Sequence, residues 1–193
     1  MILLPTDTSS PISYPTGKNQ NTVVVGDDIT IGQGLNKQKF MVIAKTNGKI
    51  TCLPYYNITI SLNSLQSSTA GITPLATSSY TASIGAIDIN NSEVLIKSYF
   101  DAYKNTLQSL GATGITTRMP VNDDFTGLTN QQKNPGLTGE YYVGNIVGMQ
   151  QGMWILSIIT DTGSSSTMAL RDSLRETPND CKGIRPIVEI NLN

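Results

Sequence analysis

The 193-residue sequence contains no histidine. Histidine is the usual general base near neutral pH, the commonest protein ligand of transition metals and the ordinary pH-sensitive group. Enzyme classes that depend on an imidazole are therefore excluded, and no other residue pattern in the chain predicts a catalytic centre. We expect a non-enzymatic protein without a cofactor or a bound metal ion.

Charged residues are also scarce: they make up 14% of the sequence, and the formal net charge is −1. A nucleic acid or an anionic membrane is attracted by a strong positive field, which this composition does not supply. Apolar runs such as residues 153–156 are far shorter than the roughly 20 residues that span a bilayer. We therefore expect neither a nucleic-acid partner nor a membrane partner.

The start of the sequence does not resemble a secretion signal, because residues 1–5 lack a basic region and a long apolar region. Two explanations stay open: a signal was removed, or the protein is made in a cytoplasm and leaves it by assembly or lysis. Residues 1–22 are rich in Pro, Ser, Thr and Asn, which predicts an extended N-terminal arm before a domain over residues 23–193. The apolar residues 2–4 either pack on a neighbouring subunit or belong to a frayed terminus.

The clearest strand signal is a hairpin. Residues 40–44 and 49–53 are mainly apolar, and they flank Asn47-Gly48, the pair that type I′ hairpin turns prefer. Two shorter strands are predicted before the hairpin, at residues 22–25 and 29–31.

The last apolar stretch of the chain, residues 184–190, is rich in β-branched residues and predicts a strand wedged between neighbours. Pro186 has no N–H to donate, so it is expected at the beginning of this strand. We expect the segment to lie inside a sheet and to pair with a part of the chain made much earlier.

One amphipathic α-helix is predicted. Apolar residues recur at spacings of three and four from Val94 to Leu110, Asn91 or Ser92 provides an N-cap, and Gly111 provides a stop. The apolar face of this helix must lie on a sheet. The remaining signals are a short second helix within 121–128, strands at 141–144 and 152–159, and loops at 129–139 and 160–166, with no clear signal over 167–180. The fold class is α+β.

The order of these pieces resembles a known family. The segments that carry the resemblance are Ile-Thr-Cys-Leu-Pro-Tyr-Tyr-Asn-Ile (50–58), Tyr-Phe-Asp-Ala-Tyr-Lys-Asn-Thr-Leu-Gln-Ser-Leu-Gly (99–111), Arg-Met-Pro (118–120), Tyr-Tyr-Val-Gly (141–144), Met-Trp-Ile-Leu (153–156) and Gly-Ile-Arg-Pro-Ile-Val-Glu-Ile (183–190). Together they are similar to C-type-lectin-like domains of bacterial surface and phage proteins, distantly similar to the formylglycine-generating-enzyme and variable-receptor branch. The resemblance implies small antiparallel sheets, one main helix, a short second helix and long loops. It also implies structural roles for Arg118 and Arg185, and we expect structural roles for Pro186 and Trp154.

The two cysteines do not predict catalysis. Cys52 lies in an apolar strand, where a thiol is usually inert. The resemblance places the first hairpin beside the terminal strand, which makes a disulfide between Cys52 and Cys181 possible; two buried free thiols are the alternative. The oxygen-rich segment 176–180 has the residue types of a calcium site but the wrong spacing, so we expect a turn there and no metal.

A binding surface, if present, is expected on the loops 129–140, 144–152 and 160–180, because loops on a rigid scaffold commonly carry recognition. Tyr55, Tyr56, Tyr141, Tyr142 and Trp154 either stack on sugar rings or form the core. The candidate contact residues are Tyr141, Tyr142, Asn145, Gln150, Gln151, Asp161 and Asn179.

The composition and the resemblance together predict a non-enzymatic surface or structural protein of a phage virion, such as a decoration, fibre or receptor-contacting module. Its location would be the virion surface or the extracellular space. Its partners would be other virion or surface proteins, as a homo-oligomer or docked by the N-terminal arm, and a host-surface glycan or protein. The alternative is a bacterial cell-surface adhesin or glycan-binding domain.

Overall fold

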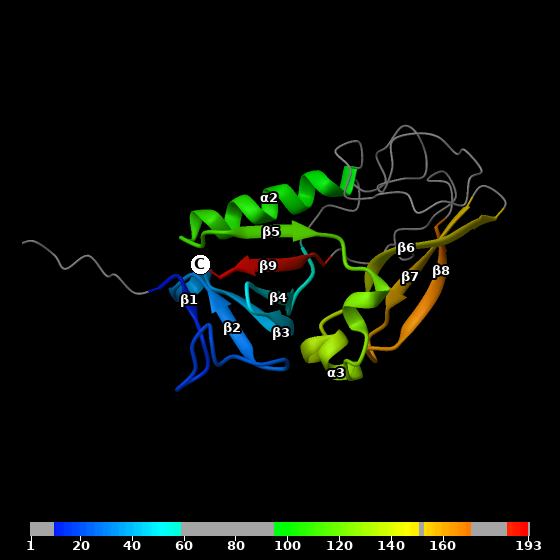
Figure 1. Cartoon of the computed structure of the whole chain (residues 1–193). Coiled ribbons are helices and arrows are strands. Elements are labelled where there is room, and N and C mark those ends of the chain that lie inside the picture. Colours follow the sequence, from blue (N-terminus) through cyan, green and yellow to red (C-terminus); the bar gives the residue numbers. More distant parts are fainter. Residues whose placement is uncertain (1–9, 59–94, 151–152, 171–184, 193) are drawn as a thin grey trace, which may run out of the picture.

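The computed structural model describes residues 10–58, 95–150, 153–170 and 185–192. It confirms an α+β fold, in which a six-stranded antiparallel sheet adjoins a three-stranded one (Figure 1). The large sheet has the order β1-β2-β3-β4-β9-β5 and consists of β1 (Ile12–Ser13), β2 (Asp28–Ile31), β3 (Gln38–Thr46), β4 (Lys49–Pro54), β9 (Ile187–Asn191) and β5 (Ile115–Arg118). The small sheet consists of β6 (Tyr141–Gln150), β7 (Met153–Ile159) and β8 (Ser165–Leu170). The helical elements are α2 (Leu95–Ser109), α3 (Asn130–Lys133) and the 3-10 helices η1 (Gly34–Asn36), η2 (Asn122–Phe125) and η3 (Pro135–Leu137).

The predicted hairpin is confirmed by the pairing of β3 with β4, in which Thr46 lies opposite Lys49 across Asn47-Gly48. Neither turn residue has a positive φ, so the turn is not of type I′. The pairing register shifts between Val42 and Ala44.

The predicted strand at 22–25 is wrong, because this segment forms turns. Lys45 Nζ donates to the carbonyl oxygens of Asn21 and Val23, at 2.6 and 3.0 Å, and so holds the segment against the hairpin. Within the predicted arm, Ile12 and Ser13 pair with β2. The predicted boundary between residues 22 and 23 stays a prediction.

The predicted closing strand is confirmed as β9, which lies inside the large sheet between β4 and β5. Pro186 comes directly before the strand, where its missing N–H costs no ladder hydrogen bond. Val188 and Ile190 are buried on one face of β9, and Glu189 points to the other face, because side chains alternate along a strand.

Helix α2 packs on the face of the large sheet that carries Val188 and Ile190 (Figure 1). Among the helix residues whose burial is described, Phe100 and Leu107 are buried, whereas Ala102, which the sequence pattern put on the apolar face, is exposed. Gly111 follows the helix with φ +97°, as a glycine stop does. Both N-cap candidates lie outside the described residues. The core between helix and sheet is formed by Val23, Ile29, Ile31, Phe40, Val42, Ile50, Cys52, Leu107, Ala112, Ile115, Val188 and Ile190.

A second apolar cluster joins the opposite face of the large sheet to the small sheet. Ile43, Leu53 and Ile187 come from the large sheet, and Phe125, Tyr141, Val143 and Ile159 come from η2, β6 and β7. The two sheets therefore share a core.

Four other elements differ from the sequence prediction. The second helix is the single 3-10 turn η2, and the predicted loop 129–139 contains α3, whose cap Thr129 accepts a hydrogen bond from Gln132 N at 3.2 Å. Strand β8 was not predicted, and β6 runs on to Gln150.

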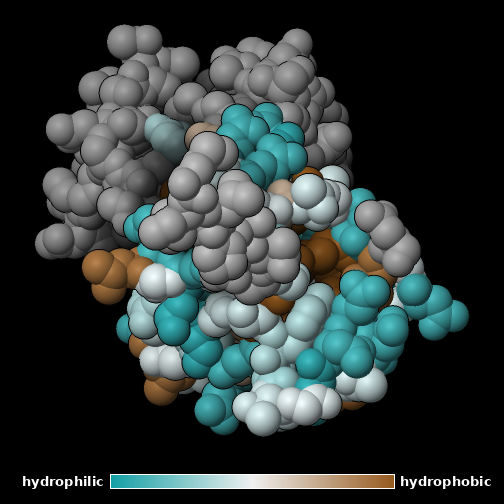
Figure 2. Space-filling model, turned by 90° about the vertical axis from the view of Figure 1, so that its left-hand side faces the viewer, coloured by the Kyte–Doolittle hydropathy of each residue, from teal (hydrophilic) through white to brown (hydrophobic). Residues whose placement is uncertain are grey.

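The described helices include none with the length and apolar character needed to cross a bilayer. On the face of the molecule in Figure 2, hydrophilic residues predominate among those described, and hydrophobic residues occur in small groups between them. This agrees with the low charge and the many hydroxyl and amide side chains of the sequence.

Candidate functional site

Four segments that are far apart in the sequence are joined by contacts around α3. They are residues 24–28, 55–57, 129–140 and 160–164, and we call them together the loop face. The predicted loops 129–140 and 160–180 contribute to it, the latter through residues 160–164, whereas residues 144–150 belong to strand β6.

Two glycines allow the outer segments to approach α3. A Cβ added to Gly163 would overlap the carbonyl group of Asn130, and a Cβ added to Gly26 would lie 3.1 Å from Gln132 Nε2. Both glycines have positive φ, at +77° and +93°, a conformation that other residues rarely adopt. Glycine is therefore required at Gly163 for both conformation and space.

Asn134 joins three parts of the loop face from within. Its side chain is fully buried, and its Nδ2 donates to the carbonyl oxygens of Gly139 at 3.1 Å and Thr160 at 3.0 Å. Its Oδ1 accepts a hydrogen bond from Arg185 Nη1 at 3.0 Å. Both the nitrogen and the oxygen of the Asn134 amide are therefore hydrogen-bonded. These bonds fix the positions of α3, residue 139 and the turn after β7 relative to one another.

Arg185 lies beneath the loop face and is fully buried. Besides Asn134, it donates to Asn57 Oδ1 at 3.0 Å, to Thr138 Oγ1 at 3.1 Å and to the carbonyl oxygen of Gly139 at 3.4 Å. Its guanidinium carbon lies 4.4 Å from the centre of the Tyr141 ring. None of these partners is a carboxylate. Burial lowers the pKa of Arg185 to about 10, so the guanidinium is still charged at neutral pH. The neutral acceptors and the aromatic ring stabilise this charge.

Tyr55 links the segment 55–57 to its neighbours. Its hydroxyl donates to Asp28 Oδ1 at 2.7 Å, and its carbonyl oxygen accepts a hydrogen bond from Thr138 Oγ1. Lys39 lies 4.0 Å from the centre of its ring and forms an ion pair with Asp28 at 2.8 Å. The hydrogen bond with Asp28 raises the pKa of Lys39, so both charges at this edge are held as a pair.

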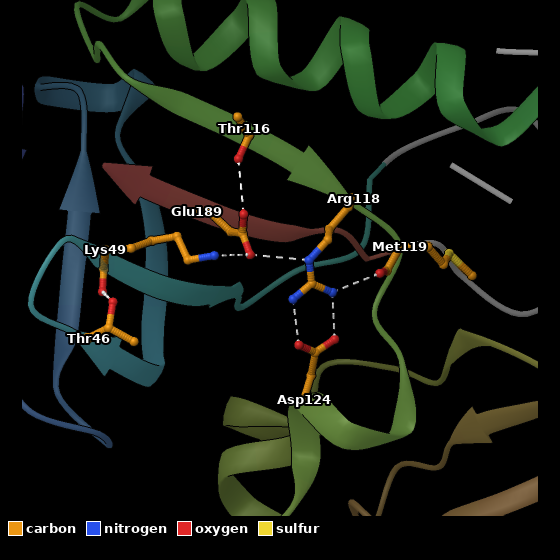
Figure 3. Close-up of polar contacts among 7 residues, drawn as sticks. All are labelled: Thr46, Lys49, Thr116, Arg118, Met119, Asp124 and Glu189. Atoms are coloured by element: carbon orange, nitrogen blue, oxygen red, sulfur yellow. Dashed lines mark hydrogen bonds and ion pairs between the residues drawn. The ribbon is translucent and has the colours of Figure 1, made fainter. Parts of the chain in front are cut away.

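A polar network covers the face of the large sheet opposite α2 (Figure 3). Arg118 forms a bidentate pair with Asp124, at 2.7 and 2.6 Å, and its Nε lies 3.2 Å from Glu189 Oε1. Lys49 Nζ lies 2.9 Å from the same oxygen, and Thr116 Oγ1 donates to Glu189 Oε2 at 3.2 Å. Arg118 therefore connects β5 and β9 to η2, and these charged groups are used within the fold.

Among the residues whose burial the structure describes, five large hydrophobic residues are exposed, and four of them lie on the loop face. They are Val24, Val25, Tyr56 and Leu137, exposed by 53, 43, 66 and 59%; the fifth, Leu35, lies in η1. Leu137 also has φ +51°, and it is the only non-glycine residue with a positive φ in the part of the chain that the structure describes. A bulky side chain in this conformation is strained.

The predicted contact residues are distributed over several environments. Asp161 is exposed on the loop face, in the turn between β7 and β8. Tyr142, Asn145 and Gln150 lie on strand β6, and Gln151 and Asn179 lie outside the described residues.

Tyr141 does not agree with its predicted contact role. Its side chain is fully buried in the cluster between the sheets, and its hydroxyl donates to the carbonyl oxygen of Lys133. The ring has no free face for a ligand, so packing, the alternative that the sequence left open, accounts for it. Trp154 lies on β7, opposite Met149 and Leu170.

Cys52 is a fully buried thiol on β4, and burial raises its pKa, which suppresses the reactive thiolate form. Cys181 lies outside the described residues, so the disulfide stays a prediction. Over the ranges that the structure describes, no three acidic or cysteine side chains come together as a metal site.

No protein-family model, curated protein or solved structure matches this chain. The resemblance to C-type-lectin-like domains therefore remains a prediction from the sequence motifs. No local sequence pattern indicates Asn134, Gly163 or Leu137 as site residues, because their roles depend on contacts between distant segments.

Proposed function

We propose that this protein is a non-enzymatic module of a phage virion surface, with a C-type-lectin-like form of the α+β fold, and that it docks on other proteins through the loop face. The observation that carries the proposal is the buried connection of Arg185 and Asn134, which holds the loops in one arrangement while leaving hydrophobic residues exposed above them. Pre-ordered loops bind a partner without a large loss of conformational entropy.

The use of the charged side chains also supports a docking role. Lys18 pairs with Asp27, Lys39 with Asp28, and Arg118 with Asp124 and Glu189. These groups stabilise the fold and its loops, and they do not converge on a common point where a substrate could react. The resemblance to phage and bacterial surface domains and the near-zero net charge favour the virion assignment, and the pairing of β9 with the first hairpin agrees with the C-type-lectin-like form of the fold.

The test is immunoelectron microscopy of purified phage particles with an antibody against the folded domain. We expect labelling at fixed positions on the particle surface. Binding of purified protein to particles that lack it should require the loop face and should be lost in the variant Tyr56→Ser/Leu137→Gly. Absence of the protein from purified particles would contradict the virion assignment.

A bacterial cell-surface adhesin is the second candidate, and the exposure of Tyr56 favours it. A tyrosine ring that is 66% exposed on an ordered loop can stack on a sugar ring. In a glycan array, an adhesin would bind specific sugars, the variant Tyr56→Ser would lose this binding, and a chelator would leave it unchanged.

A further inference from the structure

The turn between β3 and β4 contains a chemically reactive pair of residues, Asn47 and Gly48. We infer that this pair is a modification site, at which the side-chain amide of Asn47 is converted in the folded protein to an aspartate or isoaspartate carboxylate. The reaction requires no enzyme, and its only co-reactant is water. It is independent of the proposed docking function.

The chemistry of the pair is intramolecular, which favours it over attack by a separate molecule. The backbone nitrogen of Gly48 loses its proton to solvent and attacks Cγ of Asn47; the side-chain nitrogen leaves as ammonia, and a succinimide ring remains. Water then opens the ring. Cleavage of the new bond between Cγ and nitrogen gives aspartate, and cleavage of the original peptide bond gives isoaspartate, in which the main chain runs through Cγ.

Glycine after the asparagine makes this attack easier than any other residue would. Without a Cβ, the nitrogen of Gly48 can approach Cγ unobstructed, and its backbone is free to adopt the conformation that the ring requires. Asn-Gly occurs once in the sequence, at residues 47 and 48. The modification is therefore expected at one position of the chain.

The fold leaves the pair accessible. Asn47 and Gly48 are both exposed, and a Cβ added to Gly48 would meet nothing within 4 Å. Among the residues that the structure describes, neither the side-chain amide of Asn47 nor the N–H of Gly48 has a hydrogen-bond partner. No described contact therefore opposes the rotation that brings the two groups together.

Asn134 shows how the same fold protects an amide. Its side chain is buried, and hydrogen bonds hold both its nitrogen and its oxygen. The next residue is Pro135, which has no N–H and cannot act as the attacking nitrogen. The difference between Asn47 and Asn134 thus follows from their surroundings and from the residue after each.

The modified turn lies against the end of β9, which runs beside β4 (Figure 1). The carbonyl oxygen of Gly48 accepts a hydrogen bond from Leu192 N at 2.8 Å, and Thr46 and Lys49 pair directly across the turn. Isoaspartate adds one methylene group to the main chain between these fixed points. It should therefore loosen the bond to Leu192, whereas aspartate leaves the main chain unchanged.

The test is incubation of the folded full chain in mildly alkaline buffer, with peptide mass spectrometry at intervals. We expect residue 47 to gain one mass unit, as NH₂ is replaced by OH, and ammonia to be released. Gly48→Ala should slow this gain roughly tenfold. The variant should fold, because Gly48 has no positive φ and has open space around it. Asn36, which is also exposed but is followed by Lys37, is the internal control and should stay unchanged.

Comparison with the chain unfolded in urea shows whether the fold leaves the site open. The rates at Asn47 should be similar in the two states; a rate roughly tenfold lower in the folded chain would overturn the inference. An undiminished rate in Gly48→Ala, or an equal gain at Asn36, would also overturn it.

Amide hydrogen exchange at Leu192 tests the effect on β9. The isoaspartate form should exchange faster there than wild type, and the variant Asn47→Asp, which has the new charge but the normal main chain, should exchange like wild type. Faster exchange in Asn47→Asp as well would assign the effect to the charge and overturn the role of the added methylene group.

Discussion

Gly163 lies so close to the main chain of Asn130 that a side chain of any size at position 163 would overlap its carbonyl group. This contact places the turn after β7 against α3. We expect Gly163→Ala to lower the free energy of unfolding by about 2–4 kcal/mol, from the unfavourable φ and from overpacking against main chain that cannot move aside. Urea unfolding measures this change.

The matched control for that substitution is Gly17→Ala. Gly17 has the same φ of +77°, but an added Cβ would meet nothing within 4 Å. Gly17→Ala should therefore lower the free energy of unfolding only through the unfavourable φ, by about 1 kcal/mol. Equal losses at the two positions would show that the approach of Gly163 to Asn130 is not needed for the fold.

Arg185→Leu should destabilise the protein more than Arg118→Leu, although Arg185 has no carboxylate among its described partners and Arg118 has two. Removing Arg185 leaves the buried Asn134 and the partly buried Asn57 and Thr138 without their donor, which we expect to cost about 3–5 kcal/mol. Arg118 is partly exposed, so water can replace its bonds, and the expected cost is about 1–2 kcal/mol.

Denaturant unfolding of both arginine variants, with wild type in the same buffer, tests this order. Arg185→Lys should not restore stability, because one ammonium group cannot reach all the acceptors that the guanidinium binds. A larger loss for Arg118→Leu would mean that the network around Glu189, not the buried arginine, holds the structure together.

The stability of the protein should fall in acid partly through Glu189. Burial acts to raise the pKa of Glu189, but the hydrogen bond and charge of Lys49 and the charge of Arg118 outweigh it, and the pKa lies below its ordinary value of 4.5. A lowered pKa means that the stabilisation is fully present above pH 4.5 and is lost as the pH falls through the folded-state value.

Glu189→Gln should therefore be less stable than wild type at neutral pH, by roughly 1 kcal/mol, and should lose less stability between neutral and acidic pH. Part of the acid dependence will remain, because the hydrogen bond from Lys18 also lowers the pKa of Asp27. Titration of the Glu189 carboxyl by carbon NMR provides the direct measurement. A pKa at or above 4.5 would contradict the prediction.

Cys52 should resist alkylation in the native protein and react only after unfolding, since its thiol is buried and its pKa is raised by that burial. Iodoacetamide labelling followed by mass spectrometry tests this. A mass lower by two hydrogen atoms under non-reducing conditions would instead establish the bridge to Cys181. Rapid labelling of Cys52 in the folded state would contradict its position in the core.

The elements that the sequence predicted well are those with strong local patterns. The hairpin around Asn47-Gly48, the helix ending at Gly111 and the strand after Pro186 each combine an apolar period with a residue that fixes a boundary. The central position of β9 could also be anticipated, because residues 187, 188 and 190 place apolar side chains on both faces of the strand. The sequence did not distinguish a type I′ turn from the turn observed.

The site depends on contacts that local patterns do not contain. Asn134 precedes a proline and looks like an ordinary turn residue, yet its amide bridges residues 139, 160 and 185. Strand β8 begins with the polar sequence Ser-Ser-Thr, so its composition does not indicate a strand. Its strand conformation is stabilised by pairing with β7. Leu137 gave no signal, since nothing in its local sequence indicates a positive φ.

The position of β9 has a consequence for biosynthesis. Strand β5 ends at Arg118 and β9 begins at Ile187, so the gap between β4 and β5 stays open while the ribosome makes the residues in between. During that time two strand edges that the finished protein hides are available to other nascent chains. Folding should therefore be completed only after β9 has emerged from the exit tunnel, and expression at lower temperature or with a chaperone should increase the soluble yield.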